Sequence, residues 1–217
     1  MKKLPASRWV WLAVGLAATG AAFLVDDRVS AALNVAHDPV WHSIAWWCSK
    51  LGEGWVLAVA GIALAIGGLL VNRPRAAAKI FFVVLAAELA GLAAIIARAL
   101  AGRTRPLAHV PPGFYGLWHD GHWIIGKYEF SSFPSGHSAT AAGLVVALWL
   151  VHRGWGALAA VYALAVMWSR LALQCHHLSD VLASVVLATV LVRWMKPALL
   201  GTVAFQFDNL NRSLRKK

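Results

Sequence analysis

Charged residues are scarce in this chain. Only 13% of its 217 residues are Asp, Glu, Lys or Arg, whereas 60% are hydrophobic. A water-soluble domain of this length needs far more charged side chains to cover its surface, so the scarcity excludes an ordinary soluble domain. Apolar runs close to the length that crosses a bilayer recur along the chain. The sequence therefore predicts an all-α integral membrane protein that forms a single domain over residues 1–217.

Cysteine is nearly absent, which removes the ligands of many metal sites. Cys48 and Cys175 show no metal-ligand spacing, and we expect them to be two unpaired buried thiols. The alternative is a Cys48–Cys175 disulfide, which requires that both residues face an oxidising compartment. His109, His119 and His122 raise the alternative of a zinc site, but no carboxylate or Cys ligand spacing accompanies them. The sequence thus predicts neither a metal site nor a cofactor.

Acidic residues are outnumbered by basic ones. Nine Asp and Glu stand against 20 Lys and Arg, which gives a formal net charge of +11. Such a balance can indicate nucleic-acid binding, but here the basic residues gather in short segments between apolar runs, as the positive-inside rule expects. The predicted partners are therefore membrane lipids and not nucleic acid, and the sequence leaves the oligomeric state open.

Six apolar runs are candidates for membrane-spanning helices, and several are expected to extend into polar residues at their ends. The runs are Trp9–Val25, Trp55–Val71, Ile80–Ala97, Ser135–His152, Trp155–Leu173 and Ser179–Trp194. The first run follows a basic start and also fits a signal peptide, although it is long for a signal core. Six spans place both termini on one side. Because most Lys and Arg fall on that side, the termini are expected to be cytoplasmic.

A tryptophan cluster lies between the first two runs. Trp41, Trp46, Trp47 and Trp55 belong to it, and indole rings of this kind commonly lie at the level of lipid headgroups. The segment 26–54 is therefore predicted to contain an interfacial helix along the membrane surface. A helix packed over the bundle is the alternative.

Two further polar features interrupt the apolar pattern. A long loop from Arg98 to Phe133 joins spans three and four on the outer face, and loops of this length usually act as lids or binding loops. Glu88 lies near the middle of the third span, where a carboxylate is a functional candidate. The alternative for Glu88 is a protonated side chain that is hydrogen-bonded to a neighbouring helix.

Three polar clusters are expected to meet on the outer face. In order they read R-x6-R-P from Arg98, P-S-G-H from Pro134, and S-R-x5-H-x3-D from Ser169. Each cluster would mean little alone, whereas the three in order form a specific pattern. The candidate site residues are Arg98, Arg105, Ser135, Gly136, His137, Arg170, His176 and Asp180.

This pattern resembles that of the type 2 phosphatidic acid phosphatase superfamily, in which the clusters read K-x6-R-P, P-S-G-H and S-R-x5-H-x3-D. The match is complete in order and spacing, except that Arg98 stands where the family usually has Lys. Arg keeps the charge and gains bidentate reach, so this departure bears on pocket size and substrate choice. The resemblance implies a membrane-bound lipid phosphate phosphatase.

The residue types in the pattern suit phosphoryl transfer. Arg98, Arg105 and Arg170 can neutralise the phosphate oxygens over which charge spreads in the transition state. Ser135 and the backbone N–H groups of Ser135 and Gly136, at the start of a helix, can cradle a phosphate.

The resemblance also implies roles for the other residues. His176 attacks phosphorus and forms a phosphohistidine, and Asp180, four residues later on the same helical face, orients it. His137 protonates the leaving oxygen and then activates water. His177 is expected to be structural, and Arg103 to steer anionic headgroups at most. The residues alone do not decide which histidine attacks.

Other functions share a phosphate-binding pocket of this kind. The soluble vanadate-dependent haloperoxidases of the same superfamily are disfavoured by the six apolar spans. A transporter would need polar groups near the bilayer midplane, where Glu88 is the clear candidate, and a non-hydrolytic lipid-phosphate binding protein would not need the full His137, His176 and Asp180 set. The expected substrate is phosphatidic acid, phosphatidylglycerophosphate, undecaprenyl diphosphate or a lipid A phosphate. The expected location is the bacterial inner membrane, with the site on its periplasmic face.

Overall fold

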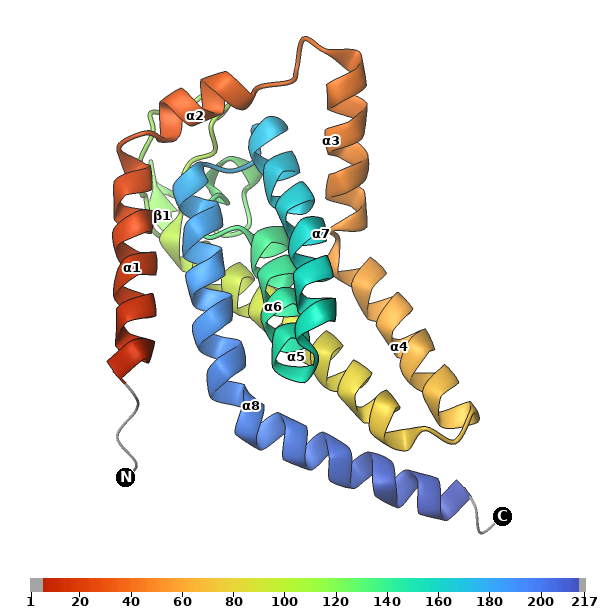
Figure 1. Cartoon of the computed structure of the whole chain (residues 1–217). Coiled ribbons are helices and arrows are strands. Elements are labelled where there is room, and N and C mark those ends of the chain that lie inside the picture. Colours follow the sequence, from red (N-terminus) through yellow and green to blue (C-terminus); the bar gives the residue numbers. More distant parts are fainter. Residues whose placement is uncertain (1–5, 215–217) are drawn as a thin grey trace.

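Helices make up nearly all of the regular structure in the computed structural model, which describes residues 6–214 (Figure 1). In order they are α1 (Ala6–Phe23), α2 (Asp26–Leu33), α3 (Pro39–Leu51), α4 (Gly54–Leu70), α5 (Pro74–Ala101), α6 (Gly136–Val151), α7 (Arg153–Ala172) and α8 (Leu178–Leu214). Between α5 and α6 lie an antiparallel hairpin, β1 (Trp118–His119) with β2 (His122–Trp123), and the 3₁₀ helix η1 (Tyr128–Phe130). The prediction of a helical fold is confirmed.

Each predicted span coincides with a helix, and the helices extend into the polar motifs as expected. Within the described residues, α5, α7 and the Leu178–Lys196 part of α8 are long and apolar enough to cross a membrane. The number rises to five if the bent pairs α1–α2 and α3–α4 each count as one span, and α6 is shorter, with 16 residues. The count of six spans therefore remains a prediction.

The segment predicted to hold an interfacial helix contains two helices. After a 73° bend behind α1, α2 lies across the end of the bundle and contacts α7 and α8, whereas α3 runs beside α7 (Figure 1). Asp38 caps α3 by accepting hydrogen bonds from the N–H groups of Val40 and Trp41, and Pro39 opens the helix. The bend brings the start of α2 to the same end of the bundle as the predicted site.

Helices α5 and α6 pack closely through small residues. A Cβ on Gly143 would lie 3.0 Å from the α5 backbone, and one on Gly91 would lie 2.1 Å from Oγ1 of Thr140. Glycine and alanine allow helix backbones to approach in this way in a membrane protein. The contact sets the distance between the ends of α5 and α6, which carry Arg98 and His137.

Gly102 ends α5 and reverses the chain. Its N–H donates to the Arg98 carbonyl at 3.3 Å, and its φ of +59° is in the left-handed region that favours glycine. A Cβ at this position would lie 2.0 Å from the Gly116 carbonyl oxygen. The turn returns the chain to the end of the bundle, where Arg103 and Arg105 are both buried.

Candidate active site

The predicted site residues gather at one end of the bundle, where α5 ends, α6 begins and residues 173–177 join α7 to α8. They are contributed by the last turn of α5 (Arg98), the α5–α6 loop (Arg105), the N-cap and first turn of α6 (Ser135, Gly136, His137), the last turn of α7 (Arg170), the α7–α8 connection (His176) and the first turn of α8 (Asp180). The structure therefore brings the three sequence clusters together.

His176 is held in one tautomer. Its side chain is 1% exposed, and Nδ1 lies 2.8 Å from the Ser132 carbonyl oxygen. A carbonyl oxygen only accepts, so Nδ1 carries the proton and Nε2 carries the lone pair. Burial lowers the pKa of His176 to about 4, with the nearby Asp180 carboxylate opposing the shift, so the imidazole is neutral near pH 7. Nε2 has no hydrogen-bond partner among residues 6–214, so its lone pair is available to a ligand.

Asp180 is fully buried and both of its carboxylate oxygens are engaged. Oδ2 accepts from Oγ of Ser132 at 2.5 Å and from the His177 N–H at 2.7 Å, and Oδ1 accepts from Arg103 at 2.5 Å. The Asp180 carboxylate is 3.7 Å from Nδ1 of His176. The Ser132 carbonyl is thus the closer partner of the imidazole, and Asp180 lies beside it as a fixed negative charge.

Arg105 and Arg170 each combine one anchored atom with one unpaired atom. Arg105 donates from Nε to the Tyr128 carbonyl at 2.9 Å and stacks on the Tyr128 ring, whereas Arg170 donates from Nη1 to Oγ of Ser49. Nη1 of Arg105 and Nε of Arg170 have no partner in the described part of the chain. Buried donors are rarely left unpaired, and such donors suit an incoming phosphate oxygen.

Arg98 completes a cluster of three guanidinium groups. Its Nη1 lies 3.8 Å from where a Cβ on Gly136 would stand, so the guanidinium group lies against the start of α6. The charges of Arg105 and Arg170 act on Arg98, and His137 is within electrostatic reach of Arg98 and Arg170. Three guanidinium groups this near repel one another, and an anion between them offsets that repulsion.

Ser135 joins the start of α6 to α8. Its Oγ caps α6 by accepting from the Ser138 N–H, its N–H donates to the Asp180 carbonyl at 3.4 Å, and its carbonyl accepts from Oγ of Ser184. The Ser135 amide is therefore not free for the phosphate cradle predicted from the sequence. The amide of Gly136, at the first helical position, is the remaining candidate.

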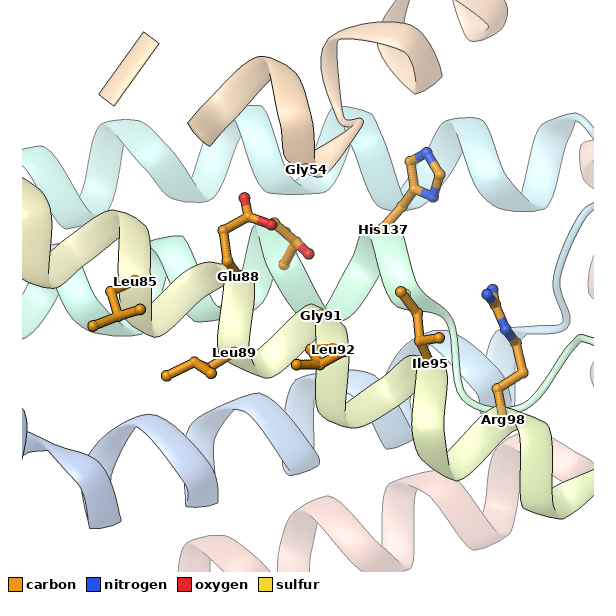
Figure 2. A pocket seen from close by; sticks show the side chains of 11 residues that line it. Gly54, Leu85, Glu88, Leu89, Gly91, Leu92, Ile95, Arg98 and His137 are labelled. Atoms are coloured by element: carbon orange, nitrogen blue, oxygen red, sulfur yellow. The ribbon is translucent and has the colours of Figure 1, made fainter. Parts of the chain in front are cut away.

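An apolar cavity of about 460 Å³ adjoins the arginine cluster, between α4, α5 and α6 (Figure 2). Arg98 and His137 lie at one end of it, and Glu88 faces it further along α5. Four apolar side chains line it, from Leu85, Leu89, Leu92 and Ile95. The site therefore combines a polar end with a hydrophobic extension.

Glu88 stands against the start of α4. One of its oxygens, Oε2, is 2.6 Å from where a Cβ on Gly54 would lie, so a larger residue at this position would make the carboxyl group shift. The other, Oε1, is buried without a hydrogen-bond partner within the described residues. The hydrogen bond to a neighbouring helix, which the sequence offered as an alternative, is not made by Oε1.

Sequence reasoning missed several residues that contact the predicted set. Arg103 was expected only to steer headgroups, but it is 7% exposed and forms ion pairs with Asp26 at 2.8 Å and Asp180 at 2.5 Å. The expectation is corrected because a buried, doubly paired guanidinium cannot attract ligands from outside. Ser49 and Ser132 also lack a motif that would single them out, and the only signal for Asp26 is a carboxylate directly after an apolar run.

The cysteines and loop histidines form no metal centre in the part of the chain that is described. Cys48 and Cys175 are both free thiols; Cys175 is buried, whereas Cys48, expected to be buried, is only half-buried. Across residues 6–214, no three His, Cys, Asp or Glu side chains are grouped as metal ligands would be. His177, expected to be structural, is buried, and its Nε2 lies 3.2 Å from the Thr104 carbonyl oxygen.

Comparison with known proteins gives matches in sequence and in structure. The sequence model of the PAP2 superfamily matches residues 76–201. The fold is similar to that of the first transmembrane PAP2 type phosphatidylglycerolphosphate phosphatase from Bacillus subtilis, with a TM-score of 0.61 and 22% identity over 89% of this chain and 94% of that chain. It is also similar to LpxE from Aquifex aeolicus, with a TM-score of 0.57 and 19% identity over 78% of this chain and 93% of that one. No curated protein sequence matches the chain.

Proposed function

The chain belongs to the PAP2 superfamily, and from this premise we propose that it hydrolyses the phosphate of a membrane lipid through a phosphohistidine on His176. The observation that carries the proposal is the lone pair on Nε2 of the neutral His176 ring, near donors of Arg105 and Arg170 that have no partner in the described residues. A nucleophile beside unpaired cationic donors suits attack on an anionic phosphorus centre.

In the first step, Nε2 of His176 attacks phosphorus and the bond from phosphorus to the leaving oxygen breaks. Arg98, Arg105 and Arg170 offset the charge on the equatorial oxygens. His137, which the negative charge of the bound phosphate keeps protonated, gives its proton to the leaving oxygen, so that the lipid departs as an alcohol or, from a diphosphate, as a monophosphate. Nδ1 of His176 keeps its proton throughout, held by the Ser132 carbonyl.

In the second step, water hydrolyses the phosphohistidine. His137, now neutral, takes a proton from the water, whose oxygen attacks phosphorus as the bond to Nε2 of His176 breaks. Inorganic phosphate leaves and both histidines return to their starting states. Asp180 stabilises the positive charge that His176 bears between the two steps. The scheme uses no metal ion and no cofactor.

The apolar cavity favours a lipid over a soluble phosphate ester. It continues from Arg98 and His137 along α5, so that a hydrocarbon chain would lie against Leu89 and Leu92 while the phosphate meets the arginines. Substrates of this type are phosphatidic acid, phosphatidylglycerophosphate, undecaprenyl diphosphate and lipid A phosphates. Of these, phosphatidylglycerophosphate corresponds to the activity named for the similar Bacillus subtilis protein.

We place the protein in the bacterial inner membrane with six spans, cytoplasmic termini and the site on the periplasmic side. The basis is the distribution of Lys and Arg between the helices. In this arrangement α2 lies at the outer interface, across the end of the bundle that carries the site. An outward-facing site near the ends of the spans would meet lipid headgroups directly.

The test is phosphate release by the purified protein in detergent with a metal chelator present, on each of the four lipids and on a soluble aryl phosphate. We expect release from at least one lipid and a higher kcat/KM for it than for the aryl phosphate. His122→Ala, an exposed loop substitution, is the matched control and should leave the rate unchanged. Binding of the lipids without phosphate release would overturn the proposal in favour of a non-hydrolytic binding protein or a transporter.

A further inference from the structure

Asp26 is a buried carboxylate that lies far from the motifs in sequence but contacts them in space. It is the first residue of α2 and is 4% exposed. Oδ2 accepts from Arg103 at 2.8 Å and from Oγ of Ser179 at 2.5 Å, and Oδ1 accepts from the Ser179 N–H at 2.9 Å. Its oxygens are thus bonded to Ser179, which precedes Asp180 in the chain, and to Arg103, which is paired with Asp180.

Arg103 bridges two carboxylates. Its Nη1 donates to Asp180 at 2.5 Å and to Oγ of Ser179 at 2.6 Å, while its Nη2 donates to Asp26. Three phenylalanine rings surround the guanidinium, at 4.6 Å, 5.2 Å and 5.9 Å from ring centroid to Cζ; they belong to Phe23, Phe114 and Phe133. Water is kept from the ion pairs, so their geometry and charge act strongly on whatever lies beside them.

We propose that Asp26 is a positioning residue for the reaction, because it holds Arg103 and Ser179 so that the Asp180 carboxylate keeps its place and its charge beside His176. This inference rests on the phosphatase function proposed above. Asp26 lies outside the residues that match the family model, 76–201. The catalytic end of the bundle is therefore completed by the N-terminal helices.

The charge balance explains why a second carboxylate is needed. Asp26, Arg103 and Asp180 together carry one net negative charge, which favours the positive charge that develops on His176 during attack. If Asp26 were neutral, Arg103 alone would cancel the charge of Asp180. His176 would then lose most of that stabilisation, although no atom in contact with it had been removed.

Attachment of α2 does not by itself require Asp26. Nε2 of Gln174 donates to the Ser30 carbonyl at 2.8 Å, and the Val35 N–H donates to the Ala172 carbonyl at 3.3 Å. These bonds connect α2 and the residues after it to the end of α7. A buried ion pair is also a weak contributor to stability compared with apolar packing, so its value lies in fixing the geometry of the site.

The experiment compares Asp26→Asn with Asp27→Asn in the full-length protein. Asp27 is the exposed neighbour on the same helix, which makes it the matched control. We expect Asp26→Asn to lower kcat about 10- to 100-fold, the range for lost outer partners of a reacting group, with KM within about twofold of wild type. The control should match wild type. An unchanged kcat, or a fall confined to KM, would overturn the proposal.

Two further variants keep the test decisive if Asp26→Asn is not recovered as folded protein. Ser179→Ala removes the two hydrogen bonds of the Ser179 hydroxyl, to Asp26 and from Arg103, but retains both ion pairs, and its kcat should fall by a smaller factor of about 3 to 10. Arg103→Lys keeps the charge but loses the planar fork whose two nitrogens separately hold Asp180 and Asp26, and its kcat should fall as far as in Asp26→Asn. Wild-type kcat in both would refute the role.

A readout without substrate separates this inference from the proposed function. In protein labelled with ¹⁵N-histidine, the ring signals of His176 are those lost in His176→Ala. They should shift in Asp26→Asn and stay in place in Asp27→Asn, because only the former changes the charge and position of Asp180. If wild type hydrolyses no lipid but these signals respond as described, the phosphatase function fails and the positioning role stands. Identical His176 signals in wild type, Asp26→Asn and Asp27→Asn would contradict the positioning role, whatever the activity.

Discussion

The two ring nitrogens of His176 face regions of opposite character. On the Nδ1 side, Nδ1 itself, both oxygens of Asp180 and the Arg103 bridge to Asp26 are hydrogen-bonded. On the Nε2 side, the nitrogen itself and one donor on each of two arginines have no partner in the described part of the chain. Since buried polar groups are normally paired, unpaired ones gathered at one place mark where a ligand binds. The contrast separates a supporting region, on the Nδ1 side, from the region on the Nε2 side where we propose that the phosphate reacts.

Removing the residue between the two regions should have the largest effect. We expect His176→Ala to abolish turnover, because the variant has no nitrogen that can attack phosphorus. The protein should still insert and bind lipid. Acid-labile labelling of wild type by a ³²P-labelled lipid, and its loss in the variant, would be measured after rapid quenching. Wild-type turnover in His176→Ala would disprove the mechanism.

The next largest effect is expected from Asp180, on the Nδ1 side of His176. Asp180→Asn keeps the shape of the side chain but removes the charge beside His176, and the rate should fall about 10²- to 10⁴-fold, by analogy with triad aspartates. The fall should appear in single-turnover rates of phosphoenzyme formation. A change in apparent affinity alone would show that Asp180 acts on binding and that the two regions are not distinct.

Among the three arginines of the cluster, Arg98 tests whether charge or geometry matters more for phosphate binding. Arg98→Ala should lower kcat/KM about 10²- to 10³-fold, the size of effect seen when one transition-state donor is removed. Arg98→Lys should keep substantial activity but shift the preference among the four lipids, because Lys acts as a point charge where Arg can hold two oxygens. The assay is the phosphate-release panel. Full activity of Arg98→Ala on every lipid would place Arg98 outside the phosphate site.

The smallest effect concerns stability and not activity. Burial lowers the pKa of His176 to about 4 from the ordinary value of 6.5, so the unfolded chain binds more protons than the folded protein between these two pH values. Stability from this group is therefore complete above pH 6.5 and declines as the pH falls towards 4. Thermal unfolding of wild type should show a steeper decline over this interval than His176→Gln. Parallel curves would mean that His176 is not buried in its neutral form.

The reacting region was largely predictable from the sequence. Phosphoryl transfer limits which residue types can act, so the order and spacing of the three clusters, with the family resemblance that they carry, selected Arg105, Arg170 and His176. The apolar runs located the helices that carry them. Helix ends were harder to place. Arg98 was assigned to the loop, but it lies in the last turn of α5, because α5 continues to the left-handed Gly102.

The supporting region was not predictable, since it depends on contacts between distant segments. Asp26 and Arg103 are 77 residues apart, and Ser49 and Arg170 are 121 apart. Single Asp and Ser residues near apolar runs have no local pattern that distinguishes a buried partner from a solvated one. Only the bend between α1 and α2 and the packing of α3 on α7 bring these residues to the site.

The phenylalanine cover over Arg103 also decides how the protein responds to dissolved ions. The screening length is about 8 Å at physiological ionic strength, but mobile ions act only where they can enter. The ion pairs of Arg103, with side chains 9%, 5% and 0% exposed, are closed to them, whereas the approach of an anionic lipid to the arginine cluster is not. If the chain acts as proposed, we therefore expect added salt to raise KM for an anionic lipid and to leave kcat unchanged.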